Sequence, residues 1–148
     1  MNLEVVNQTD HSVPKSYLTA FLVRVIKELK RRKQHDLLNG KSGLLVLFVN
    51  RNKIRQLNRD FRKKNYATDV LSFDPVEPES LGELVFCPDV LKKQAKEHGL
   101  SYRDELCYML LHGILHLMGF EHETNASNAK KMFELQDSIY SKIFPRKI

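Results

Sequence analysis

One span dominates the hydrophobic pattern of this chain: at residues 106–118 almost every side chain is apolar. A helix that is apolar all round is buried in a protein interior and does not lie on its surface. Ser101 is a suitable N-cap for such a helix, and Asp104 and Glu105 occupy its first turn, where carboxylates interact favourably with the helix dipole. Gly119 permits the left-handed conformation that ends a helix. The pattern therefore predicts one buried helix between Ser101 and Gly119.

Amphipathic periodicity and capping residues predict four further helices. Pro14 precedes the first, Asn50 is a suitable N-cap for the second, and Pro88 opens the third. His98 and Gly99 fall at the end of the third helix, so His98 is interpreted as a helix-end residue. The predicted ranges are about 15–33, 51–63, 88–98 and 125–144.

Short β-prone runs predict four strands, near residues 3–6, 44–49, 70–73 and 82–87. The run from Leu44 to Val49 is continuously apolar, which is typical of a strand buried on both faces. An acidic turn with two prolines separates the last two strands, and we expect them to pair as a hairpin. The order of elements predicts an α/β (α+β) fold, a single layer with a small mixed β-sheet of about four strands. This sheet is expected to pack against the buried helix, with about four further helices around it.

Length and composition fit one domain over residues 1–148, large enough for a hydrophobic core. No apolar run approaches the roughly 20 residues that cross a bilayer, and the first residues show no signal-peptide pattern. Two cysteines do not make a disulfide framework, so we expect a cytoplasmic protein of a reducing compartment. Cys107 is interpreted as a core residue. Cys87 is interpreted as a buried, inert thiol, although a strand end would also let it reach a metal.

Positive charge is unevenly distributed along the chain, which carries a net charge of +6. Residues 51–64 contain seven basic side chains and one acid, whereas residues 65–91 contain six acids and neither Lys nor Arg. Residues 24–33 form a second basic segment. This segment is explained equally well by a solvated helix end and by a role in binding. Such clustering indicates a polyanionic partner.

The helix predicted at 51–63 combines an apolar stripe with a row of arginines. Ile54, Leu57 and Phe61 are expected to face inward. The arginine row follows at spacings of four, four and three, in the order Arg51, Arg55, Arg59, Arg62. Guanidinium groups favour bidentate contacts to phosphates, so phosphate binding and a solvated surface both remain open for this row.

His112 and His116 are the strongly polar side chains of the buried span, and they lie four residues apart on one helix face. Burying two imidazoles side by side is costly unless each has a partner. A metal ion is such a partner, and a turn at Gly119 would bring His122 back toward it. Three nitrogen ligands leave a fourth position for water, the pattern of a catalytic site. The alternative is a set of hydrogen-bonded core histidines.

A histidine spacing of this kind also occurs in zinc peptidases, which place Glu directly after the first His as general base. Gly113 occupies that position here. The chain therefore lacks the proton acceptor of such a peptidase, and the peptidase interpretation is disfavoured.

Three ordered blocks, residues 57–62, 68–73 and 112–122, resemble the YbeY endoribonuclease family of bacterial rRNA maturation factors. The resemblance extends over nearly the whole chain. Glu83 and Glu121 stand where that family usually has Asp, and Lys63 stands where it commonly has Gly.

The resemblance implies a metal-dependent, single-strand-specific endoribonuclease. It would act in rRNA maturation, at the 3′ end of the small-subunit rRNA, and in ribosome quality control, by phosphodiester hydrolysis with a metal-bound water. Single-stranded RNA and rRNA would be its partners, with the ribosomal subunit or ribosome-associated proteins, and neither membrane nor DNA is expected. One divalent ion is implied, with zinc as the default, and nickel or another transition metal suits imidazole ligands equally.

The expected site residues come from the resemblance for the three metal ligands and Arg62, and from the charge pattern for the other RNA contacts. The metal would be held by His112, His116 and His122. Catalysis would depend on His112 and Arg62, and RNA would contact Arg55, Arg59, Arg62, Lys63 and Lys64. Glu105 and Glu121 are candidates for a general base, although a supporting or structural role is favoured for each, and attack by the RNA's own 2′-hydroxyl stays open.

Two alternatives remain at this point. The protein would be a non-catalytic RNA-binding ribosome factor if its metal were structural, which a fourth ligand such as Cys87 would indicate. It would be a metallohydrolase of another substrate class if the basic helix served only solubility.

Overall fold

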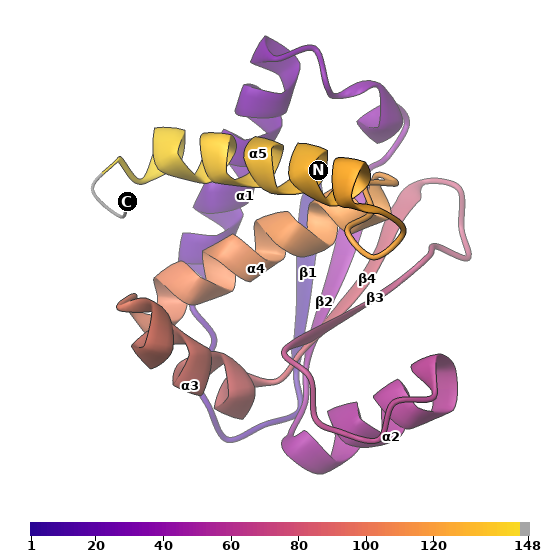
Figure 1. The fold of residues 1–148 in the computed structure, drawn as a ribbon, viewed down its shortest axis with the longest axis vertical. Helices are drawn as coiled ribbons and strands as arrows, with labels where there is room; N and C mark the ends of the chain where they lie inside the picture. The colour runs from indigo at the N-terminus through magenta and orange to yellow at the C-terminus, as the bar shows by residue number, and fades with distance from the viewer. Residues whose placement is uncertain (146–148) are drawn as a thin grey trace.

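The computed structural model describes residues 1–145, and residues 146–148 of the expected domain lie outside the described part. The elements follow the predicted order, with one short 3-10 turn added at Asp36–Leu38. The described strands and helices (Figure 1) are β1 (Asn2–Asn7), α1 (Lys15–Arg31), β2 (Gly43–Phe48), α2 (Arg51–Arg62), β3 (Val70–Phe73), β4 (Ser80–Phe86), α3 (Pro88–His98), α4 (Tyr102–Leu117) and α5 (Ala126–Ile143).

The four strands form one mixed sheet in the order β1-β2-β4-β3. β1 pairs with β2 and β2 with β4 in parallel, whereas β3 and β4 pair antiparallel. In the antiparallel pair Leu71 lies opposite Val85 and Ser72 lies opposite Leu84. The predicted hairpin and the predicted mixed α/β fold are therefore confirmed.

The buried helix α4 lies against one face of the sheet and contacts α1, α3 and α5 on its other sides (Figure 1). Its apolar residues form the main hydrophobic core together with Leu44, Val46 and Phe48 of β2. Ser101 caps the helix as predicted, because its hydroxyl oxygen accepts from the Asp104 amide at 3.2 Å. Although α4 is apolar on most sides, no helix among the described residues is long and apolar enough to cross a membrane.

The opposite face of the sheet is covered less completely. α2 packs there over a small cluster that includes Ile54, Val85 and Cys87. Leu45 and Leu47 of β2 point to this side and are only partly buried. The prediction that β2 is buried on both faces is therefore wrong for this face. The small hydrophobic cluster beneath α2 does not cover the strand completely.

Helix α2 begins at its predicted cap, where the Asn50 side chain accepts from the Lys53 amide at 3.0 Å. The predicted inward stripe is wrong at its last position, since Phe61 is 67% exposed. Asn58 is fully buried instead and donates to the Tyr66 carbonyl at 3.0 Å. The inward position is polar because the Tyr66 carbonyl, in the loop after α2, accepts this hydrogen bond.

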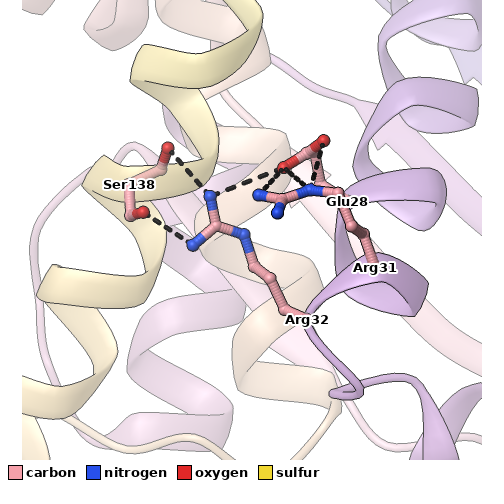
Figure 2. A network of polar contacts seen from close by, with 4 residues as sticks. All are labelled: Glu28, Arg31, Arg32 and Ser138. Atoms are coloured by element: carbon pink, nitrogen blue, oxygen red, sulfur yellow. Dashed lines mark hydrogen bonds and ion pairs between the residues drawn. The ribbon is translucent and has the colours of Figure 1, made fainter.

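The basic end of α1 is tied to neighbouring groups (Figure 2). Arg31 donates to Glu28 at 2.9 Å, and Arg32 reaches Glu28 at 3.4 Å. Arg32 also donates to the Ser138 hydroxyl of α5 at 2.7 Å, which joins the two helices. These contacts give Arg31 and Arg32 a structural role within the chain.

Candidate metal centre and its pocket

Three imidazole rings converge at the C-terminal end of α4. His112 and His116 project from the same face of the helix, with their Nε2 atoms 3.1 Å apart. The His122 ring lies 4.8 Å from the His116 ring and 5.2 Å from the His112 ring, between centroids. One nitrogen from each ring lies within 4.8 Å of the others, so the three are close enough to hold one metal ion. The predicted convergence of the three histidines is confirmed.

A tight turn after α4 brings His122 back over the helix. Gly119 adopts a left-handed conformation with φ of 100°. Its amide donates to the His116 carbonyl at 2.9 Å, and the Phe120 amide donates to the Leu115 carbonyl at 3.0 Å. These two bonds satisfy carbonyls at the end of the helix and reverse the chain.

Helix α5 packs against the histidine cluster through two of its side chains. The Gln136 side-chain oxygen lies 2.9 Å from His112 Nδ1, and both residues are buried. Phe133 of the same helix packs against the rings of His112 and His122, at centroid distances of 6.0 and 5.6 Å. Sequence reasoning assigned Gln136 only to an amphipathic helix, because the helical pattern carries no signal for a contact with a histidine.

The surroundings of the two helix histidines favour neutral rings. Burial lowers the pKa of His112, and the Gln136 hydrogen bond opposes this shift only in part. Burial, with His112 and His122 nearby, lowers the pKa of His116 to about 4. At neutral pH both imidazoles are therefore uncharged, which is the form that binds metal ions.

The donor atoms of the site fit a transition metal. His122 Nδ1 is buried and has no hydrogen-bond partner among the described residues. Three imidazoles are a ligand set that zinc and related ions accept, with further coordination left open. Cys87 is outside this group of histidines: it lies fully buried in the small cluster under α2. The interpretation of Cys87 as a buried thiol fits this position, and a closed site completed by it is not supported.

A pocket of about 330 Å³ opens beside the three histidines. α2 and the loop after it contribute Arg62, Lys64 and Tyr66 to its wall. Its remaining lining residues are Thr68, Asp69, Val70, Ser72, Met109, His112, Gly113, His116, Glu121, His122 and Glu123. The wall therefore combines two cations, three carboxylates, an exposed aromatic ring and the candidate metal centre.

Arg62 is paired across the pocket with Glu123, which sequence reasoning did not single out. The guanidinium Nη2 donates to the two carboxylate oxygens at 2.9 and 3.2 Å. The Arg62 hydrogen bond lowers the pKa of the Glu123 carboxyl, so this residue stays a carboxylate at neutral pH. Glu123 directly follows His122, and this adjacency is the signal in the sequence that could have identified it as a pocket residue.

The other basic residues of this region lie outside the pocket wall. Arg55 donates to the Asn65 side chain at 2.8 Å, and Arg59 contacts its neighbour Asp60 at 3.4 Å. Lys63 ends α2 in a left-handed conformation with φ of 56°, which a glycine adopts without strain. All three basic side chains are exposed, and none of them lines the pocket.

The two carboxylates considered as general bases differ in position. Glu105 is fully buried and accepts from His98 at 2.7 Å, and it does not line the pocket. This buried contact fits the structural role favoured for Glu105 over that of a general base. Glu121 lines the pocket and is exposed.

Together, the mixed sheet, the buried helix and the histidine cluster define an α/β protein with a candidate three-histidine metal centre in an open pocket lined by both cations and carboxylates. The family model described as Endoribonuclease YbeY matches residues 4–144. The chain belongs to this family of endoribonucleases, which are hydrolases that act on RNA.

Relatives in several bacteria are similar over most of their length. The Endoribonuclease YbeY of Bdellovibrio bacteriovorus is 47% identical over 95% of this chain and 93% of its own. That of Persephonella marina is 33% identical over 97% of this chain and 94% of its own. The solution structure of TM1509 from Thermotoga maritima, at 27% identity, covers 97% of this chain and 90% of its own with a TM-score of 0.64.

Proposed function

We propose that this protein is a metal-dependent, single-strand-specific endoribonuclease that acts in rRNA maturation, at the 3′ end of the small-subunit rRNA, and in ribosome quality control. The ribosomal subunit is then its site of action and rRNA its substrate. Family membership supports RNA as the substrate class. The observation that carries the proposal is the convergence of three histidines on a pocket that Arg62 also lines.

His112, His116 and His122 would hold one divalent ion, zinc by default, while nickel or another transition metal suits the same ligands. When bound, such an ion supplies Lewis acidity toward a phosphoryl oxygen and lowers the pKa of a coordinated water. The low pKa of His116 keeps its ring available as a ligand at neutral pH.

Arg62 and Lys64 would bind the phosphodiester next to the histidines. The scissile phosphate gains negative charge in the transition state, and a fixed guanidinium stabilises this charge. Arg62 can turn from Glu123 to phosphate at small cost, because both side chains of the ion pair are substantially exposed. Arg55, Arg59 and Lys63, beside the pocket, would contact the flanking backbone.

Preference for single strands would follow from Tyr66. This ring lines the pocket and is 53% exposed. An unpaired base can stack on such a ring, whereas the bases of a duplex are already stacked on one another. The hydrogen bond from the Asn58 side chain to the Tyr66 carbonyl holds the backbone that carries this ring beside the proposed phosphate site.

Cleavage of a labelled single-stranded RNA and of its duplex by metal-loaded protein tests the proposal. We expect cleavage of the single strand, strong loss in His112→Ala and Arg62→Gln, and wild-type rates in the controls His11→Gln and Arg51→Gln. Both control residues lie outside the pocket lining. Cleavage that survives His112→Ala contradicts the proposal. RNA binding without cleavage by the wild type would instead indicate a non-catalytic RNA-binding factor.

A further inference from the structure

We propose that Gln136 is a positioning residue: its side-chain oxygen fixes the tautomer of His112 so that Nε2 of this ring is ready to bind a metal. This inference rests on the metal site of the proposed function. It assigns a role to α5, a helix that contributes no ligand to the histidine cluster.

The contact that carries the inference is buried on both sides. The Gln136 oxygen lies 2.9 Å from His112 Nδ1, with the glutamine fully buried and the histidine 9% exposed. Water therefore has little access to compete for either atom. Phe133, one turn earlier on α5, covers the same imidazole and limits its rotation.

The chemistry of the amide oxygen determines where the imidazole proton lies. A neutral imidazole carries one N–H, and an amide oxygen can only accept a hydrogen bond. The proton of His112 must then be on Nδ1. The lone pair on Nε2 consequently points to His116 Nε2, 3.1 Å away, on the side where the three rings meet.

The opposite orientation of the amide would oppose metal binding at Nε2. If the amide nitrogen faced His112, it would donate to Nδ1 and shift the ring proton to Nε2, directed at the other histidines. The Gln136 nitrogen has no hydrogen-bond partner among the described residues, so its own surroundings do not fix the amide. A carboxylate at this position has no N–H and can only accept. We therefore expect Gln136→Glu to preserve the tautomer and Gln136→Met to lose it.

The tautomer can be measured directly in the metal-free protein. Long-range proton–nitrogen correlation spectra of ¹⁵N-histidine-labelled protein distinguish a ring protonated on Nδ1 from one protonated on Nε2. We expect Nδ1–H for His112 in the wild type and in Gln136→Glu, and a shift toward Nε2–H or a mixture in Gln136→Met. A wild-type His112 protonated on Nε2 would overturn the proposal.

Metal affinity provides the second readout, by competition of Co²⁺ with a chromophoric chelator. Loss of a group that orients a metal-binding histidine typically weakens binding 10- to 100-fold. We expect a loss in this range for Gln136→Met, recovery in Gln136→Glu, and near wild-type affinity in Ile139→Val. Ile139 is a buried core residue of the same helix, so its variant controls for disturbed packing. Wild-type affinity in Gln136→Met would contradict the assignment.

Neither measurement uses RNA. Failure of cleavage would therefore reject the proposed function while leaving the role of Gln136 intact. An unchanged tautomer in Gln136→Met would reject the role of Gln136 and leave the nuclease proposal standing.

Discussion

Arg62 Nη2 lies 2.9 Å from Glu123 Oε1 and 3.2 Å from Oε2, so the arginine that lines the pocket is already paired with a carboxylate of the same chain. The two residues come from α2 and from the turn after His122, and the pair connects the basic helix to the histidine cluster. A phosphate that enters this pocket therefore competes with Glu123 for the guanidinium of Arg62.

Removal of the Glu123 charge should strengthen phosphate binding. An exposed ion pair is worth about 0.2–1 kcal/mol, so Glu123→Gln should tighten binding of a short single-stranded RNA by up to about five-fold. Fluorescence anisotropy at fixed salt measures the dissociation constant. Glu134→Gln, on the exposed face of α5, is the matched control and removes the same charge away from the pocket. Equal tightening in both variants would show that net charge, and not release of Arg62, is responsible.

The stability of the metal-free protein should depend on His116 between pH 6.5 and pH 4. The pKa of His116 is lowered to about 4 in the folded protein, below its ordinary value of 6.5. The unfolded chain therefore binds more protons in this window, and the free energy of unfolding falls as the pH is lowered through it. Urea denaturation at several pH values should show a smaller decline in His116→Gln than in the wild type. A decline of the same size in both would contradict the pKa assigned to His116.

Gly113 should be required for the contact between α4 and the sheet. A Cβ at this position would lie 2.6 Å from Leu84 Cδ2 and 2.7 Å from Cδ1, and Leu84 is fully buried. Gly113→Ala should therefore lower the free energy of unfolding by about 1–3 kcal/mol, as overpacking of a core does. Gly43→Ala is the control, since its nearest neighbour would be 3.9 Å away. Denaturant titration checks both, and an unchanged midpoint for Gly113→Ala would contradict the tight contact.

Asn58 should stabilise the loop that carries Tyr66. Its amide donates to the Tyr66 carbonyl at 3.0 Å from a fully buried position. Asn58→Ala should cost about 1–3 kcal/mol, the range for leaving a buried polar group without its partner. Because Tyr66 lines the pocket, weaker RNA binding should accompany the loss. Asn52→Ala, exposed on the same helix, should change neither quantity, and a loss of similar size there would assign the effect to helix propensity.

The sequence predicted those features that depend on local chemistry. The apolar run of α4, the caps at Asn50 and Ser101 and the left-handed Gly119 are set by residues within one or two turns of each position. The convergence of the histidines was also predictable, because helical spacing and one tight turn connect all three.

Features that depend on distant segments were not predictable in the same way. Phe61 fits the helical period of Ile54 and Leu57, yet the buried position belongs to Asn58, which serves a carbonyl in the following loop. Gln136 lies 24 residues from His112 in sequence, and its pattern is that of any amphipathic helix. The pairing of Arg62 with Glu123 spans 61 residues, and only the fold brings the two together.

The most direct test of the account is a crystal structure of the protein soaked with zinc, with anomalous data collected on both sides of the zinc absorption edge. We predict one strong anomalous peak, with one ring nitrogen from each of His112, His116 and His122 at about 2.0–2.1 Å from it. A peak bound by other residues, or no peak among the three rings at saturating zinc, would contradict the metal centre and the nuclease mechanism built on it.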